Sequence, residues 1–225
     1  MVRVTCWLLW LVLLSAGLAA SAVAVPWQEW EAALKLASSV ALAVAAWSVC
    51  GSSSTAVWIA IGMTLGMCGD ASPFWGRPFS RAVTLAGSML LFGAGHVAYL
   101  RAIALARQHS PVASGKTMGM AVAASLLVGG VSWYWVVASS DANLAGPLLV
   151  PSLLYTLFLA AVAGRMIGLA IEQPAYSRAA AGAVLFFISD LLLGLGIFRG
   201  WDMRPVDWIW LTYGVGQMLI VYGFK

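Results

Sequence analysis

Long apolar stretches separated by short polar segments recur along the whole chain. Eight of these stretches reach or approach the length of about 20 residues that a helix needs to cross a bilayer. They are predicted to span the membrane over residues 4–25, 30–49, 55–70, 81–100, 117–138, 147–164, 179–197 and 208–224. The pattern contains no internal repeat and no separate soluble segment. It therefore predicts an all-α, polytopic membrane bundle of about eight transmembrane helices, in which residues 1–225 form a single transmembrane domain.

The polar segments between these spans are expected to be loops and turns. Gly51-Ser-Ser-Ser54 is a short polar turn, and the residues after Asp70 include the turn formers Ser72, Pro73, Gly76 and Pro78. The longest basic loop is predicted over residues 101–116. The first run ends in Ala20-Ser-Ala-Val-Ala-Val25, which is similar to a signal-peptidase site, but its length favours a retained first helix.

The basic residues favour one orientation in the membrane. Eight spans place both termini on the same side of the bilayer. Lys and Arg residues on that side are Arg3, Arg101, Arg107, Lys116, Arg165, Arg178 and Lys225, and those on the other side are Lys35, Arg77, Arg81, Arg199 and Arg204. Because cytoplasmic segments carry an excess of basic residues, this distribution favours cytoplasmic N and C termini.

The composition supports a membrane protein. The chain is 62% hydrophobic and 9% charged, whereas soluble domains contain about 25% charged residues. Of its twelve Trp residues, several fall near predicted span ends, as interfacial belts require: Trp27, Trp30, Trp75, Trp201 and Trp208. The nine Arg against three Lys, with abundant Ala and Gly, suggest a bacterium with GC-rich DNA and hence the inner membrane.

Several function classes are disfavoured by what the chain contains. Cys6, Cys50 and Cys68 lie in or beside apolar stretches, which argues against a disulfide framework or a CxxC metal site. Two histidines, His96 and His109, are too few for a three-His zinc site. No run of basic residues indicates nucleic-acid binding.

Two acidic residues stand out because they fall inside predicted spans. Asp190, beside Ser189, lies near the middle of the apolar stretch 182–196, and Asp70 ends the third span. The other six acidic residues lie in loops or near span ends. An ionisable group at membrane depth is costly and by default marks a functional site.

Other polar residues are predicted to share the membrane layer of these two carboxylates. With a helical rise of ~1.5 Å per residue, Asp70, Asp190, Lys35, Tyr155 and Tyr213 all lie ~15–22 Å from the cytoplasmic ends of their helices. The same reckoning places His96 and Gln217 ~8–10 Å from that side, along the approach to the site.

Helical spacing also supports convergence on a common face. The residues Ser88, Phe92 and His96 recur every four positions, with Tyr99 three further on, so they share one helix face. Each candidate also has a purely structural interpretation. Asp190 and His96 are suited to interhelical hydrogen bonds, Asp70 to a helix end, Lys35 to snorkelling, Ser189 to a local hydrogen bond, and Tyr155 and Tyr213 to packing.

Five motifs in the same order resemble those of the YhhN-like integral membrane proteins, whose characterised animal members are lysoplasmalogenases. They are Ala33-Leu-Lys35-Leu, Gly69-Asp70, Phe92-Gly-Ala-Gly-His96-Val-Ala-Tyr99, Gly182-Ala-Val-Leu-Phe-Phe-Ile-Ser189-Asp190 and Tyr213-Gly-Val-Gly-Gln217-Met-Leu-Ile. The chain departs from the family pattern at two positions. Leu36 follows Lys35 where the family has Pro, and Phe74 stands where the Gly-Asp motif continues to Leu.

The resemblance implies hydrolysis of the vinyl ether bond of lysoplasmalogens, giving a fatty aldehyde and a glycerophospho-ethanolamine or -choline. A vinyl ether is cleaved by protonation of its β-carbon, followed by attack of water on the oxocarbenium ion. Paired carboxyl groups in different environments can divide acid and base roles in this way, without a metal or other cofactor. We expect Asp190 to be the acid and Asp70 the base or cation stabiliser, although the reverse assignment also fits.

The remaining candidates are expected to bind a lysophospholipid substrate within the membrane lipid. Lys35 would bind the phosphate or keep Asp70 ionised, and His96, Tyr99 and Gln217 would position the headgroup or water. Tyr155, Ser189 and Tyr213 complete the predicted substrate site.

Other functions remain open at this point. The main alternative is a small transporter or lipid-binding protein that uses the buried carboxylates as a proton relay. A metal-dependent lipid amidase of the alkaline-ceramidase kind would need more histidines, and a retinal protein would need a lysine within one of the last two spans. A purely structural scaffold would not need two buried acids.

Overall fold

All eight predicted spans correspond to long helices, so the prediction of an all-helical polytopic membrane bundle is confirmed. The computed structural model describes residues 2–22, 28–49, 53–108, 115–143 and 145–224. Its long helices are α1 (Val2–Ala22), α2 (Gln28–Val49), α3 (Ser54–Asp70), α5 (Arg81–Gln108), α6 (Gly115–Trp133), α7 (Ala145–Glu172), α8 (Ser177–Arg199) and α9 (Trp208–Gly223). Three short elements complete the described fold: α4 (Ser72–Trp75), the π-helical turn η1 (Tyr134–Ala138) and the 3₁₀ turn η2 (Pro174–Tyr176).

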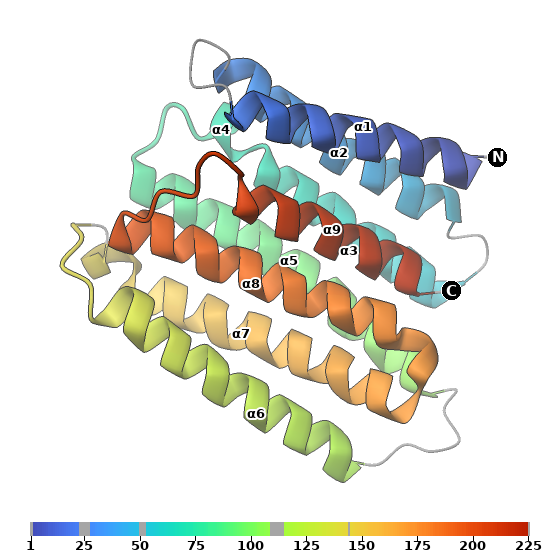
Figure 1. Cartoon of the computed structure of the whole chain (residues 1–225). Coiled ribbons are helices and arrows are strands. Elements are labelled where there is room, and N and C mark those ends of the chain that lie inside the picture. Colours follow the sequence, from blue (N-terminus) through green and yellow to red (C-terminus); the bar gives the residue numbers. More distant parts are fainter. Residues whose placement is uncertain (1, 23–27, 50–52, 109–114, 144, 225) are drawn as a thin grey trace.

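The helices pack side by side as an up-and-down bundle (Figure 1). In the described part of the chain, six helices are long and apolar enough to cross a membrane, while α3 and α9 have 17 and 16 residues. The start of α1 and the end of α9 lie at the same end of the bundle, and α1 and α6 form opposite edges (Figure 1). The helix α9 contacts α1, α2, α3 and α8, so it closes the centre of the bundle.

Glycines set how closely the central helices approach. A Cβ atom on Gly182 of α8 would lie 2.5 Å from the carbonyl oxygen of Gly216 of α9. Between α3 and α5, a Cβ on Gly62 would lie 2.9 Å from the carbonyl oxygen of Gly95. Membrane helices gain little from hydrophobic burial against one another, so this close backbone packing is a main source of their association.

The predicted basic loop 101–116 is wrong over its first half, because α5 continues to Gln108. Likewise α7 extends to Glu172, beyond the predicted end at residue 164. The guanidinium of Arg107 donates two hydrogen bonds to the Glu172 carboxylate, with N–O distances of 3.0 and 3.1 Å. This bidentate ion pair joins the last turn of α5 to the last turn of α7. Arg107 and Glu172 therefore lie within helices, and not in the loops where the sequence predicted them.

Two other boundaries differ from the predictions. The stretch after Asp70, predicted as a loop, contains the one-turn helix α4, and Trp75 within it donates its indole N–H to the carbonyl of Cys68 at 3.0 Å. The predicted helix 117–138 changes from α to π geometry at Tyr134. Its last turn is held by Arg199 of α8, which donates to the carbonyl of Trp135. The predicted end of the first span at residues 23–25 lies outside the described residues.

The close packing of α8 on α9 makes a specific prediction for Gly182. We expect Gly182→Ala to lower the melting temperature of the protein in detergent, because overpacking a tight contact costs about 1–3 kcal/mol. Gly93→Ala is the matched control, since a Cβ at that helical position meets nothing within 4 Å beyond its chain neighbours and the backbone of its own helix. An equal fall in melting temperature for both variants would contradict the assignment of Gly182 as a close-contact residue.

Candidate active site

Asp70 lies at the last position of α3, where three helices meet. Its Oδ2 atom accepts hydrogen bonds from the hydroxyls of Ser39 on α2 and Tyr213 on α9, each at 2.6 Å. The Asp70 side chain is partly buried. Two hydroxyl donors replace part of the water that a carboxyl group loses inside a bundle.

A chain of hydrogen bonds continues from Tyr213 into the bundle. The side-chain amide of Gln217 lies one turn further along α9 and approaches the Tyr213 hydroxyl at 3.4 Å. Its carbonyl oxygen accepts a hydrogen bond of 2.8 Å from Tyr99 on α5. Tyr99, Tyr213 and Gln217 are all buried, which means that the structure brings these three predicted site residues together with Asp70.

Asp190 forms a second polar centre on α8. Its Oδ2 atom accepts a hydrogen bond of 2.6 Å from the hydroxyl of Tyr155 on α7. Among the described residues, Tyr155 is the one donor to this carboxylate. Different residues hold the Asp190 and Asp70 carboxylates, Tyr155 for the first and Ser39 and Tyr213 for the second.

A cavity of about 110 Å³ adjoins Asp190. Its walls are mostly apolar and come from α5, α6, η1, α7 and α8. Polar groups on the lining are Ser88, Ser132, Ser152, Tyr155, Thr156 and Asp190. Ser88 also donates to the carbonyl of Gly69 at 3.2 Å, so one wall of the cavity contacts the backbone directly before Asp70. An apolar hollow with a few convergent polar groups is the usual form of a small-molecule site.

Aromatic rings lie between the two carboxylate centres. Phe92 of α5 lines the cavity, and its ring is 5.9 Å from that of Phe186 and 6.0 Å from that of Tyr213, centre to centre. The rings of Phe186 and Tyr213 are 5.4 Å apart. These contacts keep the Asp70 hydrogen-bond chain and the Asp190 cavity in separate surroundings.

His96 and Ser189 lie near the site without reaching the cavity wall. The Nδ1 atom of His96 donates to the carbonyl of Phe92 at 2.7 Å, and its ring centre lies 4.8 Å from that of Phe186. Ser189 donates to the carbonyl of Phe186 at 2.8 Å. Both side chains are buried, and each hydrogen bond lies within one helix, while the ring contact of His96 with Phe186 joins α5 to α8.

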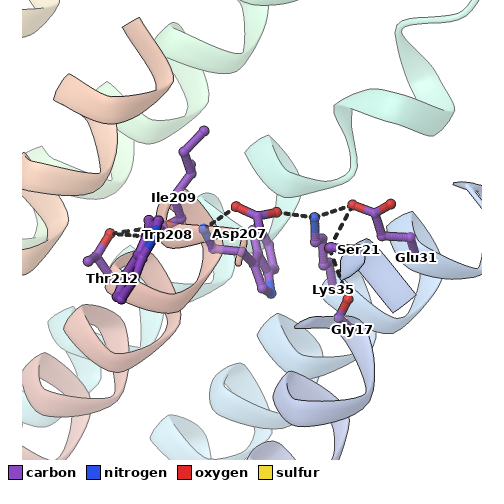
Figure 2. A network of polar contacts seen from close by, with 9 residues as sticks. Gly17, Ser21, Glu31, Lys35, Asp207, Trp208, Ile209 and Thr212 are labelled. Atoms are coloured by element: carbon purple, nitrogen blue, oxygen red, sulfur yellow. Dashed lines mark hydrogen bonds and ion pairs between the residues drawn. The ribbon is translucent and has the colours of Figure 1, made fainter. Parts of the chain in front are cut away.

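Lys35 belongs to an ion-pair network near the starts of α2 and α9 (Figure 2). Its ammonium group contacts the carboxylates of Glu31 and Asp207, and it lies 5.8 Å from the centre of the Trp210 ring. Ser21 of α1 donates to Glu31 at 3.0 Å, while Asp207 accepts from the Trp210 backbone N–H at 2.9 Å. The network therefore joins α1, α2 and the start of α9, with two carboxylates around one cation.

Several residues of the site were not predicted from the sequence. They are Glu31, Ser39 and Asp207, together with Ser88, Ser132, Ser152 and Thr156 as cavity residues. A signal was present for two of them, because Glu31 and Ser39 stand four residues before and after Lys35 on the same helix face.

In the residues described, no three His, Cys, Asp or Glu side chains gather as a metal site would need.

The fold and site define an integral membrane protein with two carboxylate centres inside a helical bundle. The model of the YhhN family matches residues 30–224, so the chain belongs to the YhhN family. Proteins named lysoplasmalogenase from Mycobacterium bovis and Mycobacterium tuberculosis are each 27% identical to it over 171 residues. Those matches cover 74% of this chain and 60% of the length of the two relatives. No solved structure matches the chain.

The surroundings of Lys35 predict a structural role for its ammonium group. We expect Lys35→Met to lower the free energy of unfolding by about 2 kcal/mol, since charge-assisted hydrogen bonds are lost and two carboxylates remain together. The measurement is the melting temperature in detergent, with Arg204→Met as control, because Arg204 pairs with Asp202 in an exposed loop. An unchanged melting temperature together with a raised KM would instead indicate that Lys35 binds substrate.

Proposed function

We propose that this protein is a lysoplasmalogenase-like membrane hydrolase. It would cleave the vinyl ether bond of lysoplasmalogens to a fatty aldehyde and glycerophospho-ethanolamine or -choline. The observation that carries the proposal is the apolar cavity with Asp190 and Tyr155 on its wall. Membership of the YhhN family and the two mycobacterial relatives support the same substrate class.

The proposed reaction begins with proton transfer to carbon. A carboxylic acid protonates the β-carbon of the vinyl ether, and the former double-bond electrons form the new C–H bond. The remaining oxocarbenium ion takes up water, and the proton lost by this water returns to the carboxylate left by the first step, which gives a hemiacetal and restores the acid. The hemiacetal then collapses to the aldehyde and the glycerol hydroxyl, so one water molecule is consumed in each turnover.

Asp190 is the proposed acid because it borders the cavity. Tyr155 fixes its Oδ2 atom, which leaves Oδ1 to hold the transferable proton toward a bound lipid. The mostly apolar walls would favour the protonated form of the acid before the reaction. They would also limit the number of water molecules that compete for the proton.

Asp70 is the proposed ionised partner that stabilises the oxocarbenium ion. Both of its hydrogen-bond donors, Ser39 and Tyr213, suit a carboxylate that stays charged. Gln217 and Tyr99 hold Tyr213 in place, while His96 packs its ring on Phe186. Lys35 acts on this site through α9, because Asp207 begins the helix that carries Tyr213.

The proposed location is the bacterial inner membrane, with both termini in the cytoplasm. In that orientation the Asp190 cavity lies in the half of the bundle away from the cytoplasm, near Trp133 and Phe198. Fluorescence or protease protection of tags at the two termini tests the orientation independently of activity.

The proposed function predicts the behaviour of two aspartate variants. Detergent-purified protein should release fatty aldehyde from 1-alkenyl lysophosphatidylethanolamine or lysophosphatidylcholine. We expect Asp190→Asn and Asp70→Asn each to lower kcat by about 100-fold or more, the range for loss of a general acid or a charge-stabilising group. Aldehyde formation is measured after trapping with a hydrazine reagent.

Asp202→Asn is the matched control for these variants. Asp202 lies in the exposed loop between α8 and α9, and hydrogen bonds from Arg204 lower the pKa of its carboxyl group to about 2. Its replacement should leave kcat unchanged, and all three variants should elute and melt as folded protein. Full activity of Asp190→Asn would rule out the proposed acid, and binding without aldehyde release by the wild type would favour a lipid-binding or transport function.

A further inference from the structure

A second hollow, of about 220 Å³, lies on the membrane-facing side of α7. Its lining comes from three helices and includes Ala124, Val128, Ala163, Ile167, Val184 and Phe187. Ala124, Val128 and Val184 are exposed on the surface of the bundle, which is where lipid surrounds the protein. The hollow is therefore an apolar groove that opens sideways into the bilayer, and we call it the chain groove.

The chain groove continues the Asp190 cavity along the same helices. On α7, the residues up to Leu159 line the cavity, and those from Ala160 onward line the chain groove. On α8, Phe187 belongs to both linings, with Asp190 on the cavity side and Val184 on the groove side. The two hollows thus follow one another, and the Phe187 ring forms part of both walls.

The linings of the cavity and of the chain groove differ in polarity, as do the polar and hydrocarbon ends of an ether lipid. The cavity carries a carboxyl group and several hydroxyls, whereas Ser125 is the single polar residue among the described residues that line the groove. Along α7, the distance from Thr156 in the cavity to Ile167 in the groove corresponds to a rise of ~16 Å. This run is long enough to hold most of an extended fatty chain beside the bundle.

We propose that the chain groove binds the hydrocarbon chain of the single-chain ether lipid whose vinyl ether lies at Asp190. Phe187 marks the boundary between the reacting bond and the chain, and the headgroup points toward the loop 200–207. This inference rests on the proposed function for the identity of the lipid. The succession of the two hollows along α7 and α8, with Phe187 on both linings, supports it separately.

The groove would select chains by fit rather than by hydrophobicity. A chain that enters it leaves a bilayer that is equally apolar, so burial from water contributes little to binding. Shape and length of the groove then determine which chains are held with the vinyl ether at Asp190. Filling the groove should therefore change chain-length preference more than overall activity.

Ala124→Phe tests this expectation, because it places a ring in the groove from an exposed position. Its matched control is Ala123→Phe, an exposed neighbour on α6 that does not line the groove. We expect Ala124→Phe to lower kcat/KM for a hexadecenyl lysolipid about tenfold or more relative to an octenyl one. The control should keep the wild-type ratio, and an equal ratio in both variants would overturn the proposal.

A binding experiment on the wild-type protein separates this proposal from the hydrolase proposal. The probe is a saturated alkyl-ether lysophosphatidylethanolamine with a photoreactive diazirine at the end of its chain, which has no vinyl ether to cleave. We expect adducts on the segments 124–128, 160–167 and 184–187, and their loss when excess unlabelled alkyl lysolipid competes. Such adducts without aldehyde release from the vinyl ether substrate would support the groove and overturn the hydrolase.

A different labelling pattern would overturn the chain groove. Adducts spread over lipid-facing residues of α1 and α2, with no effect of competing lysolipid, would show ordinary surrounding lipid and overturn the groove. Aldehyde release together with that pattern would leave the hydrolase standing. Ala124→Phe adds an internal check, because it should remove the groove adducts if the protein remains folded.

Discussion

The structure depends on the high cost of a carboxylate inside a membrane bundle. A charged or protonated carboxyl group there needs hydrogen-bond partners, since lipid supplies none. Asp70 obtains them from Ser39 and Tyr213, and Asp190 obtains one from Tyr155. Because these donors come from α2, α9 and α7, the contacts that satisfy the acids also fix how the helices are arranged.

Close packing then gives the two acids different surroundings. Glycine contacts between α8 and α9 and between α3 and α5 let Phe92, Phe186 and Tyr213 meet edge to face in the centre. One side of these rings holds a continuous hydrogen-bond chain, and the other holds an apolar cavity. Separate surroundings for two carboxyl groups are the physical basis for giving them separate roles in one reaction.

The sequence predicted the spans and the family correctly, and it singled out Asp70 and Asp190 because charges inside apolar helices are rare. It also grouped Tyr155 and Tyr213 with them by depth alone. The partners were harder to predict, because helix rotation decides which residue at a given depth faces which. Asp207, for example, pairs with Lys35 across 172 positions, and no local pattern indicates this contact. The helix ends at Gln108 and Glu172 depend on a similar distant pair, Arg107 with Glu172.

The central claim is that the protein protonates carbon and then adds water. The most direct measurement is turnover of 1-alkenyl lysophosphatidylethanolamine in D₂O, with the aldehyde trapped as it forms and analysed by mass spectrometry. Protonation of the β-carbon predicts one deuterium at carbon 2 of every aldehyde molecule, together with a slower reaction than in H₂O. Aldehyde without deuterium at that carbon would contradict acid catalysis at the vinyl ether and, with it, the role proposed for Asp190.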